Sequence, residues 1–463
     1  MSLSSEFLAE SQSAFDAERR FALAQNAVTR TDPVEVTLKR ASHPSPSDTN
    51  SGQELRHAFS VRLSKEMRAC NQRASGRCWI FACLNTLRNA MARKYDLPDD
   101  FELSQTYTFF FDKLERVNFT LQRIIETATE PLDGRLVTHL LSDPMCDGGQ
   151  WDMLVNVITK YGVVPKQAMG EAWSSTMSRR FNTLMTAKIR EWAEQLRAAA
   201  DEAARRAMLE PMLRETHRLL LIHFGTPPTR FDWTFHTKKG GADSFKRFTD
   251  CTPLSFYADH VPVDVSSKVS LIHDPRNEYW KAYTVSMLGN VEGGSPVFYL
   301  NVPIEVLKKC ALQTLQADQP VWFGCDSRRA FHRKTQTWDT EQFDLDLVFG
   351  TTLSQDKAAR LRHGESLMTH AMVFTACDLP EGATVPTIWR VENSWGETDG
   401  AKGYAYMTDK YWDEYMYQVV VDKELAGAYD DRLKQLIDAG VTDEATVLPP
   451  WDPMGSLAHG TSL

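Results

Sequence analysis

The sequence predicts an α+β fold whose first half is mainly helical and whose second half is mainly strands. Two observations support this prediction. Apolar residues recur at helical spacing over 78–95, and residues that favour helices are abundant over 176–224. Beyond about residue 293, short runs rich in β-branched and aromatic residues alternate with Gly, Pro, Asp and Asn, which is typical of strands joined by turns.

The helical half can be followed element by element. Residues 1–30 are polar and predict helix, and residues 31–55 are rich in Pro, Ser and Asn, which indicates a linker or arm. A helix is expected to begin near Cys78, because Ile80, Leu84, Leu87 and Met91 share one helical face. This face should be buried.

Further helices are expected over 100–165, interrupted by the turn-like run "SDPMCDGGQW" at 142–151. Long helices should follow over 176–224, with a break at Pro211, since proline interrupts a helix interior. The strand-like runs "GGSPVFYLNV", "QPVWFGCD", "LMTHAMVFTACDL" and "TIWRVENSWGE" come later.

Composition excludes several classes of protein. The chain is 42% hydrophobic and 24% charged, as in proteins that bury a large core. Its formal charge of -9 argues against a surface that binds nucleic acid everywhere, although a local basic channel stays possible. No run approaches 18 apolar residues, so no membrane span is expected. The N-terminus lacks the basic and apolar regions of a signal peptide.

The cysteine pattern argues against a metal site and a disulfide framework. No C-x-x-C pair and no Cys/His cluster with zinc spacing occurs, so no metal or cofactor is expected. Scattered cysteines without an export signal predict reduced thiols in a cytoplasmic protein. The eight cysteines are Cys70, Cys78, Cys83, Cys146, Cys251, Cys310, Cys325 and Cys377.

One cysteine has the surroundings of a nucleophile. Cys78 stands at a predicted helix start, where the helix dipole favours a thiolate, and Gln72 lies six residues upstream. His370 lies in an apolar strand, where an imidazole without a partner is costly to bury. Asn393 follows in the next strand, with Trp395 able to cover it. A nucleophile, a base and a group that orients the base are the parts that thiol catalysis needs.

These residues stand in motifs that resemble those of papain-like cysteine peptidases. "QRASGRCWIFA" at 72–82 is similar to the nucleophile signature, and "THA" and "NSWG" are similar to the His and Asn motifs. "AKGY" at 401–404 and "MCDGGQW" at 145–151 resemble a later turn and the loop that lines the substrate. The resemblance implies the following roles: Cys78 as nucleophile, His370 as base and later acid, Asn393 as the group that orients it, Gln72 with the Cys78 N–H as oxyanion hole, Gly148 and Gly149 as substrate-wall glycines, and Trp395 as a shield.

Finer motifs resemble the bleomycin hydrolase and aminopeptidase C family within that group. They span nearly the whole chain: "SGRCW", and the runs at 103–116, 147–153, 321–326 and 450–458. The resemblance implies a two-lobed papain-like fold, with a helical lobe, a β-barrel-like lobe, a helical insertion and a C-terminal arm. The implied boundaries are 1–60 for an N-terminal helix and arm, 61–165 for the helical lobe, 166–260 for the hook-like insertion, 261–445 for the β-rich lobe and 446–463 for the arm.

One departure from secreted papain-like enzymes concerns a disulfide. Those enzymes carry a cysteine three residues before the nucleophile, bridged to the cysteine of their C-x-G-G loop. Here Ser75 occupies the first position, so Cys146 has no partner. This difference favours a reducing, cytoplasmic location.

The resemblance also assigns a function to the arm. In this family the C-terminal carboxylate meets the free α-ammonium of the substrate, which makes the enzyme an aminopeptidase. This chain continues past Ala458 with "HGTSL", so we expect trimming to a terminus near Leu457–Ala458. Peptides with a free N-terminus are the expected substrates, and a homohexamer is the expected assembly.

Two alternatives stay open on the sequence. One is an endopeptidase or amide hydrolase without a strict requirement for a free N-terminus. The other is a nucleic-acid-binding assembly protein built on a peptidase fold, against which the charge of -9 counts.

Overall fold

A large mixed sheet forms the centre of the molecule in this computed structural model, which describes residues 4–38, 58–241, 244–398, 400, 402–440 and 445–455. Its strands run in the order β14-β5-β6-β4-β13-β7-β10-β11-β12-β9-β8, and β1 pairs with β10. The strands are β1 Val61–Arg62, β4 Lys268–Ile272, β5 Lys281–Val285, β6 Tyr299–Asn301, β7 Val321–Cys325, β8 Phe331–His332, β9 Thr337–Trp338, β10 His370–Asp378, β11 Ile388–Glu392, β12 Tyr404–Thr408, β13 Met416–Asp422 and β14 Thr446–Leu448.

The central strands are buried on both faces. Trp322 of β7 and Val373 of β10 belong to one core cluster, while their neighbours Phe323 and Phe374 belong to a second. This alternation follows from the period of two along a strand. The first cluster lies under helices α4 (Cys78–Tyr95), α5 (Gln105–Glu126), α7 (Trp151–Tyr161) and α9 (Arg179–Ala198), and the second under α13 (Ile304–Gln316), α16 (Asp409–Tyr415) and α17 (Lys423–Tyr429). The predicted α+β class is confirmed.

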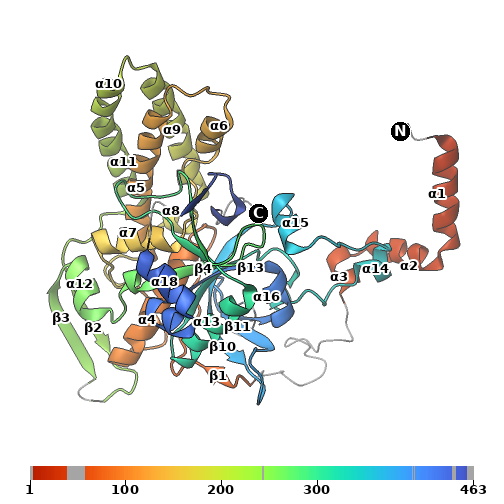
Figure 1. Cartoon of the computed structure of the whole chain (residues 1–463). Coiled ribbons are helices and arrows are strands. Elements are labelled where there is room, and N and C mark those ends of the chain that lie inside the picture. Colours follow the sequence, from red (N-terminus) through yellow and green to blue (C-terminus); the bar gives the residue numbers. More distant parts are fainter. Residues whose placement is uncertain are drawn as a thin grey trace.

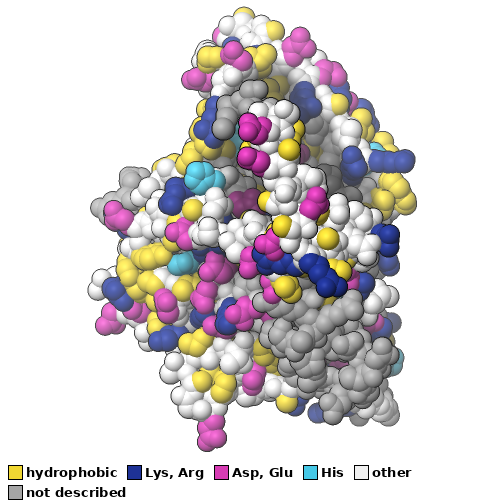
Figure 2. Space-filling view, turned by 90° about the vertical axis from the view of Figure 1, so that its right-hand side faces the viewer, with side chains coloured by type: hydrophobic (Ala, Val, Ile, Leu, Met, Phe, Trp, Pro, Cys, Tyr) yellow, Lys and Arg dark blue, Asp and Glu magenta, His cyan; other side chains and the backbone are white. Residues whose placement is uncertain are grey.

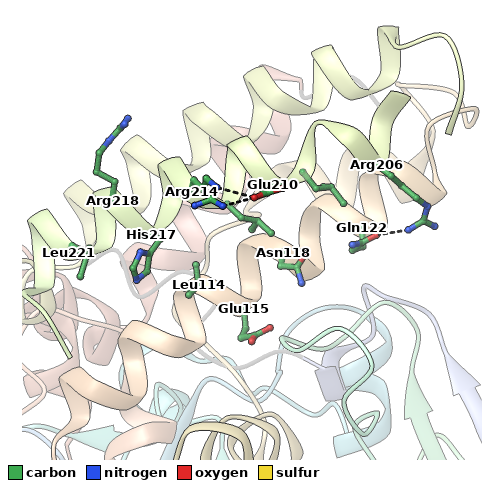
Figure 3. A pocket seen from close by; sticks show the side chains of 12 residues that line it. Leu114, Glu115, Asn118, Gln122, Arg206, Glu210, Arg214, His217, Arg218 and Leu221 are labelled. Carbon is green, nitrogen blue, oxygen red and sulfur yellow. Dashed lines mark hydrogen bonds and ion pairs between the residues drawn. The ribbon is translucent and has the colours of Figure 1, made fainter. Parts of the chain in front are cut away.

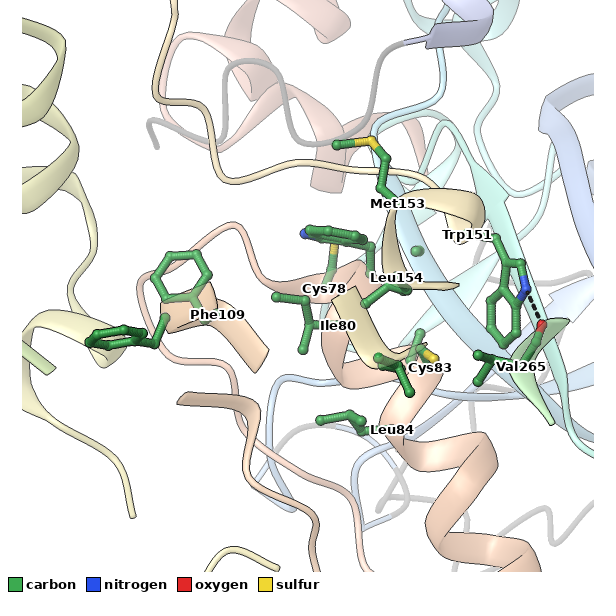
Figure 4. Packing of buried hydrophobic residues seen from close by; sticks show 14 of the residues in the cluster. Cys78, Ile80, Cys83, Leu84, Phe109, Trp151, Met153, Leu154 and Val265 are labelled. Atoms are coloured by element: carbon green, nitrogen blue, oxygen red, sulfur yellow. Dashed lines mark hydrogen bonds between the residues drawn. The ribbon is translucent and has the colours of Figure 1, made fainter. Parts of the chain in front are cut away.

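Helix α4 carries the first predicted site residue. It begins at Cys78, as the sequence predicts, and every residue from Cys78 to Ala92 is buried. It is therefore a central helix rather than an amphipathic surface helix. Its buried neighbours in Figure 4 include Trp151 and Leu154 of α7, and the Trp151 indole N–H donates to the Val265 carbonyl at 3.2 Å.

The segment between α7 and the sheet contains a helical bundle and a hairpin. Helices α9 (Arg179–Ala198), α10 (Glu202–Ala207) and α11 (Leu209–Phe224) stand together with α5 and with α6 (Arg135–Ser142) at the top of Figure 1. They are preceded by α8 (Trp173–Thr176) and followed by the hairpin β2 (Phe231–His236) and β3 (Phe245–Cys251), then by α12 (Pro253–His260) and the short turn η1 (Val265–Ser267). The sequence did not predict the hairpin.

The expected break at Pro211 is wrong. The chain breaks at 199–201 and again at Met208, and Pro211 lies in the first turn of α11. A proline is tolerated there, because the first N–H groups of a helix have no carbonyl partner within it. The first break, at 199–201, follows an Ala-rich sequence that carries no strong signal for the end of a helix.

The N-terminal segment extends away from the sheet. Helices α2 (Arg19–Val28) and α3 (Pro33–Thr37) lie beside α14 (Leu345–Phe349), and α1 (Ser5–Ala17) contacts α2 and is the outermost element at the right of Figure 1. No residue of α1 or α2 is buried. The remaining helices α15 (Lys357–Arg362) and α18 (Asp431–Ala439) and the turn η2 (Pro453–Gly455) lie around the strands, so the segment expected to be β-rich also contains helices.

The visible surface has no single sign of charge. On the face shown in Figure 2, Lys and Arg side chains are interspersed with Asp and Glu. Among the described residues, no helix is long and apolar enough to cross a membrane. The charges of this face do not form the continuous basic stripe that a phosphate backbone would require.

Candidate active site

The residues before α4 pair with the loop that follows β11. The Gln72 N–H donates to the Ser394 carbonyl at 2.8 Å, and the Gly396 N–H donates to the Cys70 carbonyl at 2.9 Å. Gly396 has φ +85°, and a Cβ there would lie 2.5 Å from the Asn71 amide nitrogen. This glycine is required, and it lets the two irregular segments lie directly against each other.

The Gln72 side chain is fixed in one orientation. Its Oε1 accepts from the Ser394 hydroxyl at 2.5 Å, and its Nε2 donates to the Ser75 carbonyl at 2.5 Å. A primary amide has two N–H groups, so one remains for another acceptor. Gln72 is 6% exposed, so little of its surface is open to water.

The Cys78 thiol lies where α4 meets β10. It is buried, and the backbone N–H groups of Ala371, Trp79 and Cys78 itself lie close enough to favour the thiolate over the thiol. Burial raises the pKa of the thiol to about 11, and these N–H groups act in the opposite direction. Ala371 directly follows His370 in β10, so the strand that brings the Ala371 N–H near Cys78 also carries the histidine.

His370 is oriented by an amide oxygen. Its Nε2 lies 2.9 Å from Asn393 Oδ1, which also accepts the Ser394 N–H at 2.8 Å. Because the backbone N–H can only donate, the Asn393 oxygen must face it, and His370 Nε2 therefore carries the proton. The other ring nitrogen, Nδ1, is left as an acceptor.

The environment of His370 is dry. Its ring stacks on Trp395 at a centroid distance of 5.4 Å and an interplanar angle of 27°. Burial lowers the pKa of His370 to about 4, and the hydrogen bond to Asn393 acts in the opposite direction. A lone imidazolium is thus as unfavourable here as a lone thiolate at Cys78, so the two charges are favoured only as a pair.

The loop with Gly148 and Gly149 packs on the residue after the nucleophile. A Cβ at Gly149 would lie 2.6 Å from the Trp79 ring, and the Trp79 indole N–H donates to the Asp147 carbonyl at 2.7 Å. The Gly148 carbonyl accepts from Arg116 at 2.8 Å. Glycine at 149 is therefore required by packing against Trp79.

The structure brings together most of the predicted site residues. Gln72, Cys78, His370, Asn393 and Trp395 meet between α4, β10 and the loop after β11. Gly148 and Gly149 lie beside Trp79. Ala458 lies outside the described residues. The catalytic and binding roles stay predictions.

Sequence reasoning missed the polar residues that support this arrangement. Asp147, Lys113 and Ser394 are buried and each bonds to a residue of the site or its neighbours. All three stand inside the quoted motifs, which was the available signal. The side chains of Lys and Asp are rarely fully buried without a partner, but a sequence does not reveal which partner they find.

A separate groove lies in the helical bundle. It has a volume of about 730 Å³ between α5 and α11, where Leu114, Leu213 and Leu221 lie among Arg214, Arg218 and Glu115 (Figure 3). No predicted site residue lines this groove. Within the described part of the chain, no cluster of three His, Cys, Asp or Glu residues is placed to hold a metal ion.

Comparison with known proteins decides the family. The model of the Peptidase C1-like family matches residues 2–455. The chain belongs to this family. It is 43% identical over 454 residues to the bleomycin hydrolase of Gallus gallus, covering 96% of each chain, and 41% identical over 472 residues to that of Homo sapiens, covering 99% of each.

Bacterial members of the Peptidase C1-like family are equally similar. The aminopeptidase C of Listeria monocytogenes is 42% identical over 424 residues, covering 91% of this chain and 93% of the relative. The crystal structure of pepw from Lactobacillus rhamnosis superposes with a TM-score of 0.90 at 39% identity, covering 98% of this chain and 99% of that one. The predicted family, its papain-like α+β fold and its cysteine-peptidase class are confirmed.

Proposed function

We propose that this protein is a thiol aminopeptidase that hydrolyses N-terminal peptide bonds and related amide bonds through an acyl-enzyme on Cys78. The observation that carries the proposal is the geometry around His370. Asn393 fixes the proton on Nε2, so that Nδ1 is the acceptor, and the backbone N–H of the next residue, Ala371, lies close enough to Cys78 to favour its thiolate. This is the arrangement of a base that can accept the thiol proton.

The reaction proceeds in two halves. As the thiol proton moves to His370 Nδ1, the sulfur attacks the carbonyl carbon of the substrate, and the oxyanion accepts from the Cys78 N–H and the second N–H of Gln72. His370 then donates its proton to the leaving amine. Water, activated by the same nitrogen, hydrolyses the thioester and releases the product. Trp395 keeps water from the His370–Asn393 bond.

The free N-terminus would be selected by the C-terminal arm. Its described part is firmly held: β14 pairs in parallel with β5, Asp452 accepts from Arg276 at 2.8 Å, and the Met454 carbonyl accepts from Tyr299 at 3.0 Å. A carboxylate beyond this anchor, near Ala458 after trimming, would pair with the α-ammonium of the substrate. Such a charged hydrogen bond is worth about 1.5–3 kcal/mol, or roughly ten- to hundredfold in rate.

Replacement of Cys78 tests the nucleophile. Cys78→Ala should abolish hydrolysis of aminoacyl-fluorogenic substrates. Cys83→Ala is the matched control, because Cys83 lies on the same helix, is equally buried and should retain activity. Full activity in Cys78→Ala would refute the mechanism.

Blocked substrates test the specificity. The enzyme should cleave peptides with a free N-terminus at least tenfold faster than their N-acetylated forms, and a chain ending at Ala458 should show the same preference. Intact-mass measurement of active enzyme should reveal loss of His459–Leu463. Equal rates on free and blocked peptides would instead favour the endopeptidase alternative.

Assembly and location form part of the proposal. The exposed Phe7 and Leu8 on α1, which buries no residue, support association with further copies, and we propose a homohexamer. Light scattering should give six times the mass of 52.6 kDa. We propose a cytoplasmic location, although one relative from Saccharomyces cerevisiae, 42% identical over 403 residues, is named a mitochondrial cysteine proteinase. Fractionation of the source cells would decide this.

A further inference from the structure

The Asp147 carboxylate is saturated with hydrogen-bond donors from three parts of the chain. Oδ2 accepts the Gly76 N–H at 2.8 Å and the Ser178 hydroxyl at 2.5 Å. Oδ1 accepts the Asn182 amide at 2.6 Å and lies 2.8 Å from the Lys113 ammonium. A carboxylate accepts about four such bonds, so this one has no capacity left.

Asp147 also bonds to both sides of the nucleophile. Its carboxylate accepts from Gly76, two residues before Cys78, and its backbone carbonyl accepts from the indole of Trp79, the next residue. The segment 76–79 is therefore tied to one residue of the opposite loop at two points. Gly149, two residues further along this loop, packs on the same indole.

The other donors connect this clamp to the helical bundle. Ser178 is the residue before α9, Asn182 lies in its first turn, and Lys113 lies on α5. Lys113 is wholly buried, and it also donates to the carbonyls of Met145 and Cys146 at 3.0 and 2.8 Å. The Asp147 carboxylate thus connects the helical bundle to the start of α4.

We propose that Asp147 is a positioning residue for the reaction: it holds the Cys78 segment and the glycine loop in register, as an ionic clamp where secreted papain-like enzymes have a disulfide. The inference rests on the proposed function, because it assigns to Asp147 the placement of that nucleophile. Ser75 and Cys146 occupy the two bridge positions, and Asp147 directly follows Cys146.

Asp147 can affect the reaction in two ways, through its negative charge and through the position in which it holds the Cys78 segment. Three cations interact with the Asp147 carboxylate: Lys113, Arg116 and Arg77. Its charge also affects the thiols of Cys146 and Cys78. His370 lies on the strand side of the Cys78 site. The negative charge of Asp147 raises the pKa of Cys78. Removing that charge alone should therefore make the thiolate easier to form, while removing the clamp should slow turnover.

Three variants separate the two effects. Asp147→Asn should shift the pH midpoint of Cys78 alkylation by iodoacetamide downward, because Lys113 is left uncompensated, yet should lower kcat at least thirtyfold. Lys113→Met should shift the midpoint upward. The double variant Asp147→Asn/Lys113→Met should restore the midpoint but not kcat. KM should change less than threefold throughout.

Matched controls distinguish the clamp from a general loss of fold. Asp152→Asn alters a partly buried carboxylate five residues on, which accepts from the Phe298 N–H and bonds to no residue of 76–79, so kcat should stay within twofold. Ser178→Ala removes one donor at a distance from the sulfur and should lower kcat three- to tenfold. If Asp147→Asn does not fold, as judged by thermal unfolding, Ser178→Ala decides: an unchanged kcat overturns the proposal.

Other outcomes also overturn it. A double variant that regains kcat would mean that Asp147 acts through charge alone, and an Asp147→Asn variant with kcat within threefold of wild type would exclude the clamp. Alkylation is read on the Cys78 peptide by mass spectrometry without substrate. A wild type that hydrolysed no peptide would therefore refute the proposed function alone. The alkylation rates of the variants, measured at a pH where Cys78 is fully ionised, would still report on the placement of Cys78.

Discussion

The two sides of the active site are held by different kinds of contact. On the nucleophile side, ion pairs hold the irregular segments: the buried Arg77 lies 3.0 Å from Glu171, and Lys113 of α5 lies 2.8 Å from Asp147. On the histidine side, the contacts of the His370 ring are neutral, and the nearest buried ion pair, Arg88 with Glu392 at 2.6 Å, lies at the end of β11. His370 begins β10, which pairs with β7 and β11, and its ring contacts only an amide and an indole among the contacts described for it.

The difference follows from the backbone. A strand satisfies its own N–H and C=O groups through its neighbours, so β10 needs no polar side chains for support. The segments 71–77 and 143–150 lack such neighbours along most of their length, and their buried polar groups must be satisfied by side chains. Ions supply several strong bonds each, and they are stable in a buried site only as pairs.

Breaking the Arg77 pair should have the largest effect on stability. Arg77 is wholly buried, donates to Ser75 Oγ at 2.9 Å and lies over the rings of Phe81 and Phe109. Arg77→Met should lower the free energy of unfolding by about 3 kcal/mol, near the lower limit for a broken buried pair because Glu171 is partly exposed. Urea unfolding at pH 7 measures this.

An exposed pair gives the control for Arg77. Arg68 pairs with Glu397 at the surface, where solvent screens the charges. Arg68→Met should leave the urea midpoint unchanged. Equal losses in the two variants would show that burial does not distinguish the nucleophile side.

Replacing Asn393 on the histidine side should lower catalysis more than stability. Asn393→Ala removes the oxygen that fixes the proton on His370 Nε2, so the ring loses its tautomer and orientation. We expect kcat to fall by roughly a hundredfold, as for partial loss of general acid–base catalysis. The free energy of unfolding should fall by about 1–3 kcal/mol, because the buried Ser394 N–H loses its acceptor. A variant with normal kcat would show that Trp395 stacking alone orients the ring.

This contrast also separates what the sequence could predict from what it could not. The periodicity of 78–91 and the strand-like runs predicted α4, β7, β10 and β11, because burial pattern is a local property. The motifs predicted which residues meet at the site. The Lys113–Asp147 contact joins positions 34 apart, and charge alone does not indicate such a partner, so the buried ionic support had to be read from the structure.

The hairpin and the break before α11 were missed for a related reason. Trp233 and Phe248 stack on each other across β2 and β3, and both meet Tyr95 at the end of α4 edge to face. That aromatic cluster forms only when three distant segments meet. Local propensity over 230–251 is too weak to predict a strand pair without it.

The neutral groups of the strand side should make the protein sensitive to mild acid. Burial lowers the pKa of His273, at the end of β4, to about 3. A His with a lowered folded-state pKa contributes stability that is present above about 6.5 and is lost as pH falls towards 3. Asp147, whose pKa lies well below its usual range beside Lys113, loses its contribution only below about 3.8.

The variant His273→Gln tests this sign. Gln can still donate to the Val302 carbonyl, which His273 contacts at 3.1 Å, but it does not titrate. Between pH 6.5 and 4.5 the unfolding free energy of the wild type should fall more steeply than that of the variant, by up to about 1.4 kcal/mol per pH unit. Parallel curves would show that the pKa of His273 is the same in the folded and unfolded states.

The smallest effect is expected for Cys146, although it stands where secreted relatives form a disulfide. Its thiol is free and touches only the Arg116 guanidinium, at 3.6 Å, among its side-chain contacts in the described structure, while Lys113 bonds to its backbone carbonyl. Cys146→Ser should therefore change the unfolding free energy by less than about 1 kcal/mol and leave kcat within twofold. A large decrease in the unfolding free energy or in kcat would mean that the sulfur itself supports the loop. We expect a small decrease, because the Asp147 carboxylate and the backbone carbonyls supply the contacts on the nucleophile side.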